Sequence, residues 1–277
     1  MRLACLALLA ALLACPAGCD GPAAPPTRPM VVVSVLPQAY LVERIAGDLV
    51  DIQVMIPPGA GEMYEPTVSQ IAAAARASLY VKVGHPNFPF EAQWLDRMVG
   101  EETPVVDASA EFQRRDSDPH VWVSPASARR MAENIGAALV KLLPEHRDAL
   151  LERQSRLIDD IDELDEEIRT MLAPCRGRTF FVFHPAWGYF ADEYGLVQRS
   201  IEHDHKQPST GHLVEFEIAA RESNARAIFV QPQFPREAAD RIGDDIGAEV
   251  IVVDPLQRDW LAGTRHMAES LARTLAP

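Results

Sequence analysis

The fold is decided by one stretch in the middle of the chain, EHRDALLERQSRLIDDIDELDEEIRTML, which runs from Glu145 to Leu172. Charged residues fill most of the positions between its apolar residues, and neither glycine nor proline interrupts it. At 1.5 Å per residue, about 28 residues in one helix would extend about 42 Å, the width of a whole domain. The apolar residues recur at helical intervals of three and four: Leu150, Leu151, Leu157, Ile158, Ile161, Leu164, Ile168 and Met171. The pattern predicts a single amphipathic helix that spans the molecule.

On both sides of this helix, short apolar runs alternate with helical patterns, which argues for mostly parallel sheets flanked by helices. The expected strands are Met30–Leu36, Val50–Ile56, Leu79–Val83, Thr179–Phe183, Ala227–Val230 and Glu249–Val253. The predicted fold class is α/β, with two lobes that are each a mostly parallel sheet flanked by helices, joined by one long backbone helix. We expect an N-terminal lobe over residues 30–144, the linking helix over 145–173 and a C-terminal lobe over 174–277.

The first 29 residues are set aside from the fold. Residues 1–18 combine a basic start, an apolar run from Leu3 to Leu13 and small residues, which indicates a secretory signal peptide. Small residues directly before Cys19 favour lipid attachment at that cysteine, with Cys15 as the competing site and a plain cleaved signal as the alternative. Residues 19–29 are proline-rich and predict a tether. The protein is therefore expected to be exported to the periplasm or the outer face of the cytoplasmic membrane.

Composition and charge restrict the class of partner. The 277 residues are 48% hydrophobic and 24% charged, which is typical of a globular protein. Forty acidic against 26 basic residues give a net charge of −14, which repels phosphate backbones and argues against nucleic-acid binding. The body contains no apolar run long enough for a membrane-spanning helix. We expect a monomer.

Histidines stand at the ends of the predicted strands. His85 follows Leu79–Val83, and His184 follows Thr179–Phe183. His120 lies in a loop before a helix predicted to begin at Ser124-Pro125, and Asp254 ends the strand Glu249–Val253. The carboxyl ends of parallel strands are where open α/β sheets bind ligands. Three imidazoles and one carboxylate suit a borderline-soft divalent metal such as zinc.

Several motifs together resemble one family, the zinc- and manganese-binding proteins of bacterial ABC importers whose lobes are joined by a long rigid helix. The similar segments are Ile56–Ala60 with Tyr64–Thr67, Asp118–Trp122, His184–Phe190 with Tyr194–Leu196, Gln231–Phe234 and Val253–Leu256. The resemblance implies a solute-binding protein, here a lipoprotein, that holds a metal between its lobes and delivers it to a membrane permease. It implies His120, His184 and Asp254 as ligands.

The chain departs from the family at one ligand. The family usually has a histidine just before the Tyr-Glu-Pro segment, whereas this sequence has Gly61-Glu62-Met63. We predict His85 as the substitute, which gives the ligand set His85, His120, His184 and Asp254, with Glu62 as the competing substitute. Zinc is the predicted metal because three imidazoles and one carboxylate suit it, and manganese is the alternative.

Other readings remain open at this point. Gln231 follows a strand and could orient a ligand, and the loop around His203 and His205 is interpreted as solvated, with a transient metal contact as its alternative. An exported metallohydrolase would need a general base beside the metal, but the sequence has no His-Glu-x-x-His or Gly-x-Ser-x-Gly pattern. A binding protein with an altered or lost metal site is a third reading.

Overall fold

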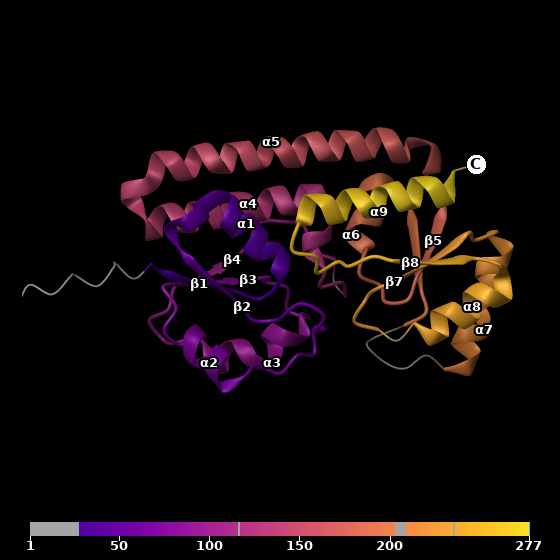
Figure 1. The fold of residues 1–277 in the computed structure, drawn as a ribbon, viewed down its shortest axis with the longest axis horizontal. Helices are drawn as coiled ribbons and strands as arrows, with labels where there is room; N and C mark the ends of the chain where they lie inside the picture. The colour runs from indigo at the N-terminus through magenta and orange to yellow at the C-terminus, as the bar shows by residue number, and fades with distance from the viewer. Residues whose placement is uncertain (1–27, 116, 203–208, 235, 277) are drawn as a thin grey trace, which may run out of the picture.

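Two lobes lie side by side beneath one long helix (Figure 1). The computed structural model describes residues 28–115, 117–202, 209–234 and 236–276. The predicted signal peptide, the lipid-attachment cysteines Cys15 and Cys19, most of the tether, and His203 and His205 therefore lie outside the described residues. The predicted α/β fold with two lobes and a linking helix is confirmed.

The N-terminal sheet has four parallel strands in the order β2-β1-β3-β4. They are β1 (Met30–Val33), β2 (Asp51–Val54), β3 (Leu79–Lys82) and β4 (Val105–Asp107). The valines of β1 are completely buried, as expected for an inner strand covered by helices on both faces. The sheet direction places the loops that follow β2, β3 and β4 at one edge.

The C-terminal sheet repeats this arrangement in the order β6-β5-β7-β8. Its strands are β5 (Thr179–Val182), β6 (Val197–Ser200), β7 (Ala227–Val230) and β8 (Glu249–Val252). The sequence analysis did not find β4 or β6. β4 has only three residues, and both strands leave a large residue exposed, Val105 in β4 and Val197 in β6, so neither has the apolar run of an inner strand.

Nine α-helices are described, and several of them lie together along the top of the molecule in Figure 1. The helices are α1 (Leu36–Ala46), α2 (Val68–Ala74), α3 (Pro89–Met98), α4 (Pro125–Leu142), α5 (Arg147–Leu172), α6 (Gly188–Tyr194), α7 (Thr210–Glu222), α8 (Glu237–Ile246) and α9 (Trp260–Leu275). Short 3₁₀ turns occur at Gly47–Leu49, Val121–Val123, Pro144–His146 and Ala173–Cys175. Among the described residues, no helix is long and apolar enough to cross a membrane.

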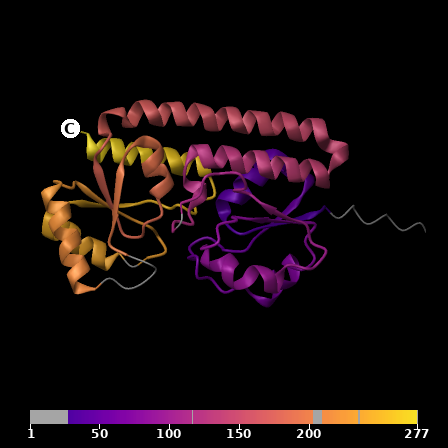
Figure 2. The ribbon, with the colours of Figure 1, turned by 180° about the vertical axis from the view of Figure 1, so that it is seen from behind.

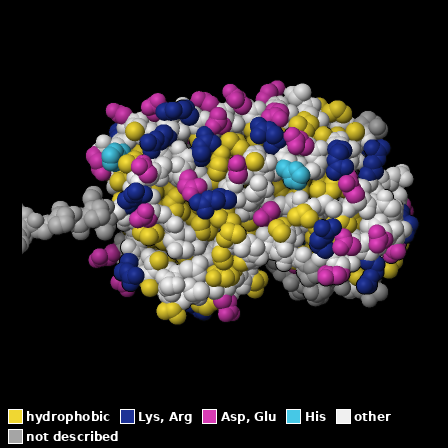
Figure 3. Space-filling view, viewed as in Figure 1, with side chains coloured by type: hydrophobic (Ala, Val, Ile, Leu, Met, Phe, Trp, Pro, Cys, Tyr) yellow, Lys and Arg dark blue, Asp and Glu magenta, His cyan; other side chains and the backbone are white. Residues whose placement is uncertain are grey.

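The long helix α5 connects the lobes by packing against both. It lies along α1 and α4 of the N-terminal lobe and along α9 of the C-terminal lobe, as both ribbon views show (Figures 1 and 2). Its outer face is charged, and Asp160, Asp162 and Glu167 pair with arginines of α1, α4 and α9 respectively. The space-filling view shows acidic and basic side chains interspersed along these upper helices (Figure 3). The residues of α5 that are buried include Leu150, Leu157, Ile161, Leu164, Ile168 and Leu172.

Two tryptophans join the lobes below these helices. The Nε1–H of Trp122 donates to the carbonyl oxygen of Pro255 at 2.8 Å, and the Nε1–H of Trp260 donates to the carbonyl oxygen of Trp122 at 2.6 Å. Trp122 belongs to the loop before α4 and Pro255 to the loop after β8. These bonds hold the strand-end loops of the two sheets against each other.

Candidate metal centre

His120 is fixed by its own loop, which connects β4 to α4. Ser124 accepts a hydrogen bond from the first turn of α4, and Pro125 stands at its first position, so the loop ends where the sequence predicted. The Asp118 Oδ1 atom accepts from the backbone N–H of His120 at 3.0 Å and from its ring Nδ1 at 2.7 Å. With Nδ1 occupied in this way, Nε2 is the nitrogen that faces away from the loop.

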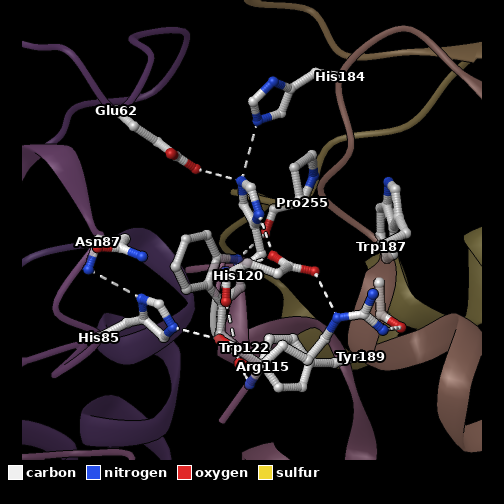
Figure 4. A network of polar contacts seen from close by, with 12 residues as sticks. Glu62, His85, Asn87, Arg115, His120, Trp122, His184, Trp187, Tyr189 and Pro255 are labelled. Atoms are coloured by element: carbon white, nitrogen blue, oxygen red, sulfur yellow. Dashed lines mark hydrogen bonds and ion pairs between the residues drawn. The ribbon is translucent and has the colours of Figure 1, made fainter. Parts of the chain in front are cut away.

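His184 is held in the same manner from the other lobe. It stands two residues after β5, and its ring Nδ1 lies 2.7 Å from Glu202 Oε2. The side-chain amide of Gln231 donates to the His184 carbonyl oxygen at 3.0 Å, and the ring of Phe234 stacks on the imidazole with centroids 5.0 Å apart. Gln231 therefore positions the backbone of His184, and Nε2 of His184 points toward His120 (Figure 4).

Glu62 completes the group from the loop between β2 and α2. Its Oε1 atom lies 2.7 Å from His120 Nε2, and the two histidine Nε2 atoms are 3.1 Å apart (Figure 4). Ligand atoms of Glu62, His120 and His184 all lie within 4.8 Å of one another, and all three residues are buried. Among the described residues, this is the one group of its kind.

Charge is concentrated at His120. Burial disfavours a charge on its imidazole, but the carboxylates of Glu62 and Asp118 outweigh that effect and raise its pKa to about 10. A protonated His120 donates from Nδ1 to Asp118 and from Nε2 toward Glu62 and His184. Because a divalent cation would satisfy the same carboxylates with more charge, it competes with this proton.

Two of the three ligand separations are close to those of a tetrahedral zinc site. Ligands about 2.0–2.1 Å from zinc stand about 3.3 Å from one another, so the 3.1 Å and 2.7 Å separations need to widen by only tenths of an ångström. Two histidines and a glutamate are a known zinc ligand combination. Carboxylates behind the two histidines, from Asp118 and Glu202, fix the orientation of each ring.

The structure does not bring His85 or Asp254 into this group. His85 donates from Nε2 to the Arg115 carbonyl oxygen at 2.8 Å and accepts at Nδ1 from the backbone N–H of Asn87 at 3.1 Å, so both nitrogens are used by the main chain. Asp254 Oδ1 accepts from the Leu256 N–H at 3.0 Å and from the Gln233 amide at 2.9 Å. Glu62, the competing substitute in the sequence, takes the place that was expected of His85.

Sequence reasoning missed Glu202. The loop around it was interpreted as solvated, yet Glu202 is buried and bonded to a candidate ligand. The signal was its position two residues after β6, a strand that the sequence analysis did not recognise. A cavity of about 210 Å³ opens beside the group, and its lining includes Glu62, His184, Glu202 and Gln233. A second cavity of about 380 Å³ on the other side is lined by both candidate histidines and Arg115.

The molecule has two lobes, and buried nitrogen and oxygen atoms converge between them. This arrangement is that of the two-lobed solute-binding proteins with a candidate metal site between the lobes. The sequence also matches, over residues 31–274, the family described as the periplasmic component A of the zinc-uptake complex. The chain belongs to this family, which consists of metal-binding components of ABC importers and is not a family of enzymes. The metallohydrolase reading is thereby set aside.

Individual relatives agree with this assignment. The chain is 28% identical to the high-affinity zinc uptake system protein ZnuA of Bacillus subtilis over 249 residues, which cover 82% of this chain and 78% of that protein. It is 26% identical to a putative metal-binding protein of Chlamydia muridarum, covering 89% and 92% of the two chains. A crystal structure of ZnuA superposes with a TM-score of 0.84 at 32% identity, covering 89% of this chain and 99% of that one.

Proposed function

We propose that this protein captures zinc at Glu62, His120 and His184 and delivers it to the membrane permease of an ABC importer. The observation that carries the proposal is the convergence of the two histidine Nε2 atoms, 3.1 Å apart, from different lobes. Because each lobe contributes ligands, zinc favours the closed pairing of the lobes through its differential affinity for that state. The permease would then recognise the closed form.

Glu62 acts as the ligand that replaces the missing histidine of the family. Its carboxylate offsets one of the two positive charges of the cation inside a buried site, which an imidazole cannot do. Asp254 lies outside this group, with its Oδ1 atom held by the Gln233 amide and the Leu256 N–H. The site thus offers more oxygen than one with three histidines, and the Glu62 position is the one to test first.

The test is a zinc titration of the chelator-stripped mature protein by competition with a chromogenic chelator, repeated with manganese. Glu62→Gln removes the charge and should weaken zinc binding by about ten- to a hundredfold. Glu65→Gln is the matched control, because Glu65 stands three residues away in the same loop but is exposed. Equal affinity of the Glu62→Gln protein and the wild type would remove Glu62 from the site. Failure of the wild type to bind zinc would overturn the function.

Attachment by a lipid at Cys19 and a monomeric state belong to the same proposal. The sequence supports the anchor through the small residues Ala17-Gly18 before the cysteine. Cys19→Ser should abolish incorporation of labelled fatty acid and release the protein from the membrane, whereas Cys15→Ser should not. The reverse result would move the anchor to Cys15, and sedimentation of the released protein measures the oligomeric state.

A further inference from the structure

Another polar contact between the lobes lies beside the metal site and involves Arg115. This arginine comes from the N-terminal lobe and reaches α6 of the C-terminal lobe (Figure 4). Its Nη1 atom donates to the Gly188 carbonyl oxygen at 3.2 Å and pairs with the Asp192 carboxylate. Its Nε atom is 3.7 Å from Asp118 Oδ2 in its own lobe. One guanidinium therefore joins α6 to the aspartate that orients His120.

Tyr189 adds a backbone version of the same link. Its hydroxyl accepts from the Arg115 backbone N–H at 2.7 Å and donates to the Asp118 carbonyl oxygen at 3.1 Å. Tyr189 belongs to α6, whereas Arg115 and Asp118 belong to the loop before α4. The loop that carries His120 is therefore bonded to the opposite lobe through both its side chains and its main chain.

Gly188 allows the two lobes to approach this closely. A Cβ atom added at Gly188 would stand 2.1 Å from Asp118 Oδ2 and 3.1 Å from Arg115 Cζ. Real Cβ atoms do not approach an oxygen at 2.1 Å, so the aspartate or the lobe would have to move. The carboxylate concerned is the one whose other oxygen holds His120 Nδ1 at 2.7 Å. The lobe contact and the ligand orientation thus share one carboxylate.

We propose that Arg115 and Gly188 are positioning residues that couple lobe closure to the orientation of His120 and so slow the release of zinc. The inference rests on the proposed function. The contacts of Arg115 with Gly188 and Asp192 cross between the lobes and can exist only when the lobes are together. Contacts that exist in only one of two states shift the equilibrium toward that state. Here that state is the closed one, which retains the metal. Their loss should therefore act on dissociation more than on association.

The test is stopped-flow release of zinc from the loaded full-length mature protein into an excess of fluorescent chelator. Arg115→Ala should speed release about tenfold while changing the association rate less than about threefold, because charge-assisted bonds present only in the closed state are lost. Gly188→Ala should speed release at least as much. Arg115→Lys should recover part of the retention, since it restores a charge beside Asp192.

Two controls separate this role from a general effect on stability. Arg156→Ala removes an exposed ion pair within α5, with Glu152, that does not cross between the lobes and involves none of the candidate ligands or the carboxylates behind them. Gly211→Ala adds a methyl group in the first turn of α7, where, among the described residues outside its chain neighbours and its own helix backbone, the nearest heavy atom lies 3.9 Å away. Both should release zinc at the wild-type rate. If Gly188→Ala does not fold, Asp192→Asn tests the same contact.

The outcomes are distinct for the inference and for the proposed function. Faster release in the Arg115 and Gly188 variants, with both controls unchanged, supports the coupling. Equal acceleration by Arg156→Ala, or release within about twofold of the wild type in Arg115→Ala, overturns it while wild-type zinc binding stands. A wild-type protein that binds no zinc would overturn the proposed function and this inference together.

Discussion

Three histidines are buried among the described residues, and only two of them face each other. His120 and His184 each have one ring nitrogen 2.7 Å from a carboxylate and the other directed into the space between the lobes. His85 is equally buried, but the main chain engages both of its nitrogens. A buried histidine thus becomes a candidate ligand when a carboxylate holds one nitrogen and the other is directed into the space between the lobes.

The difference arises from what stands near each histidine. Asp118 lies two residues before His120 and turns back onto it, and Glu202 reaches His184 from the end of the neighbouring strand β6. His85 instead begins a tight turn in which the N–H of Asn87 takes its lone pair. The local turn, and not burial or position after a strand, distinguishes the two cases.

The largest effect should come from removing either of the two facing histidines. His120→Ala and His184→Ala each delete one zinc ligand from a buried site and should weaken binding by at least about a hundredfold, about 3 kcal/mol. Competition against chelators of graded affinity measures this loss. A change below tenfold in either variant would contradict the proposed site, and His266→Ala, at an exposed position of α9, is the control.

Proton competition at His120 should give the next effect. Burial opposes the charge, but Glu62 and Asp118 raise the pKa of His120 to about 10, and zinc needs the neutral imidazole. Zinc affinity should therefore fall about tenfold per pH unit below 10 from this residue alone. The stability of the metal-free protein should change in the opposite direction. Because the pKa of His120 is higher in the folded state, its protonation stabilises the fold fully below about pH 6.5, and this stabilisation is lost as the pH rises toward 10.

Two measurements check that opposition. Zinc competition at pH 6.5, 7.5 and 8.5 should show rising affinity, while the melting temperature of the metal-free protein should fall over a rise from pH 7 to 9.5. Glu62→Gln removes the largest contribution that raises this pKa and should flatten both dependences. Zinc affinity that is constant from pH 8.5 to 6.5 would show that His120 does not exchange a proton for the metal.

A smaller effect should follow from weakening the carboxylate behind His184. Glu202→Gln keeps the shape of the side chain but removes the charge that orients the imidazole, so zinc binding should weaken about tenfold. Glu166→Gln, on the exposed face of α5, is the matched control. Unchanged affinity in Glu202→Gln would mean that shape alone positions His184.

The sequence predicted the fold more completely than the site. The pattern of apolar residues reflects burial, and burial alone determines the periodicity over Glu145–Leu172 and the apolar runs of β1 and β7. The pattern therefore predicts this helix and these two strands. β4 and β6 were missed because they are short and partly exposed. Leu151, expected on the buried stripe of α5, is 39% exposed, because the stripe narrows near the beginning of the helix.

For the site, the sequence predicted His120 and His184, which the structure brings together, but it favoured His85 over Glu62, and the structure places Glu62 beside these two histidines. That choice depends on ring orientation, which the hydrogen bonds of Arg115 and Asn87 determine. It also depends on how far the loop after β2 folds toward the other lobe, and the spacing of residues in the sequence does not determine this. The role of Glu202 was hidden because the strand before it went unrecognised.

The smallest effect on zinc affinity should come from replacing His85. This variant tests most directly whether His85 differs in role from His120 and His184. His85→Ala leaves the Arg115 carbonyl and the Asn87 N–H without their buried partner, which should lower the free energy of unfolding by about 1–3 kcal/mol. Zinc affinity should change by less than about threefold, because the guanidinium of Arg115 and the Asp118 carboxylate keep their own contacts. Denaturant unfolding and the chelator competition measure the two quantities in the same protein. A loss of stability with unchanged zinc affinity would show that His85 is a structural histidine. A loss of affinity comparable to that of His120→Ala, with stability unchanged, would return His85 to the ligand set. Its ring would then have to turn toward the metal when zinc binds.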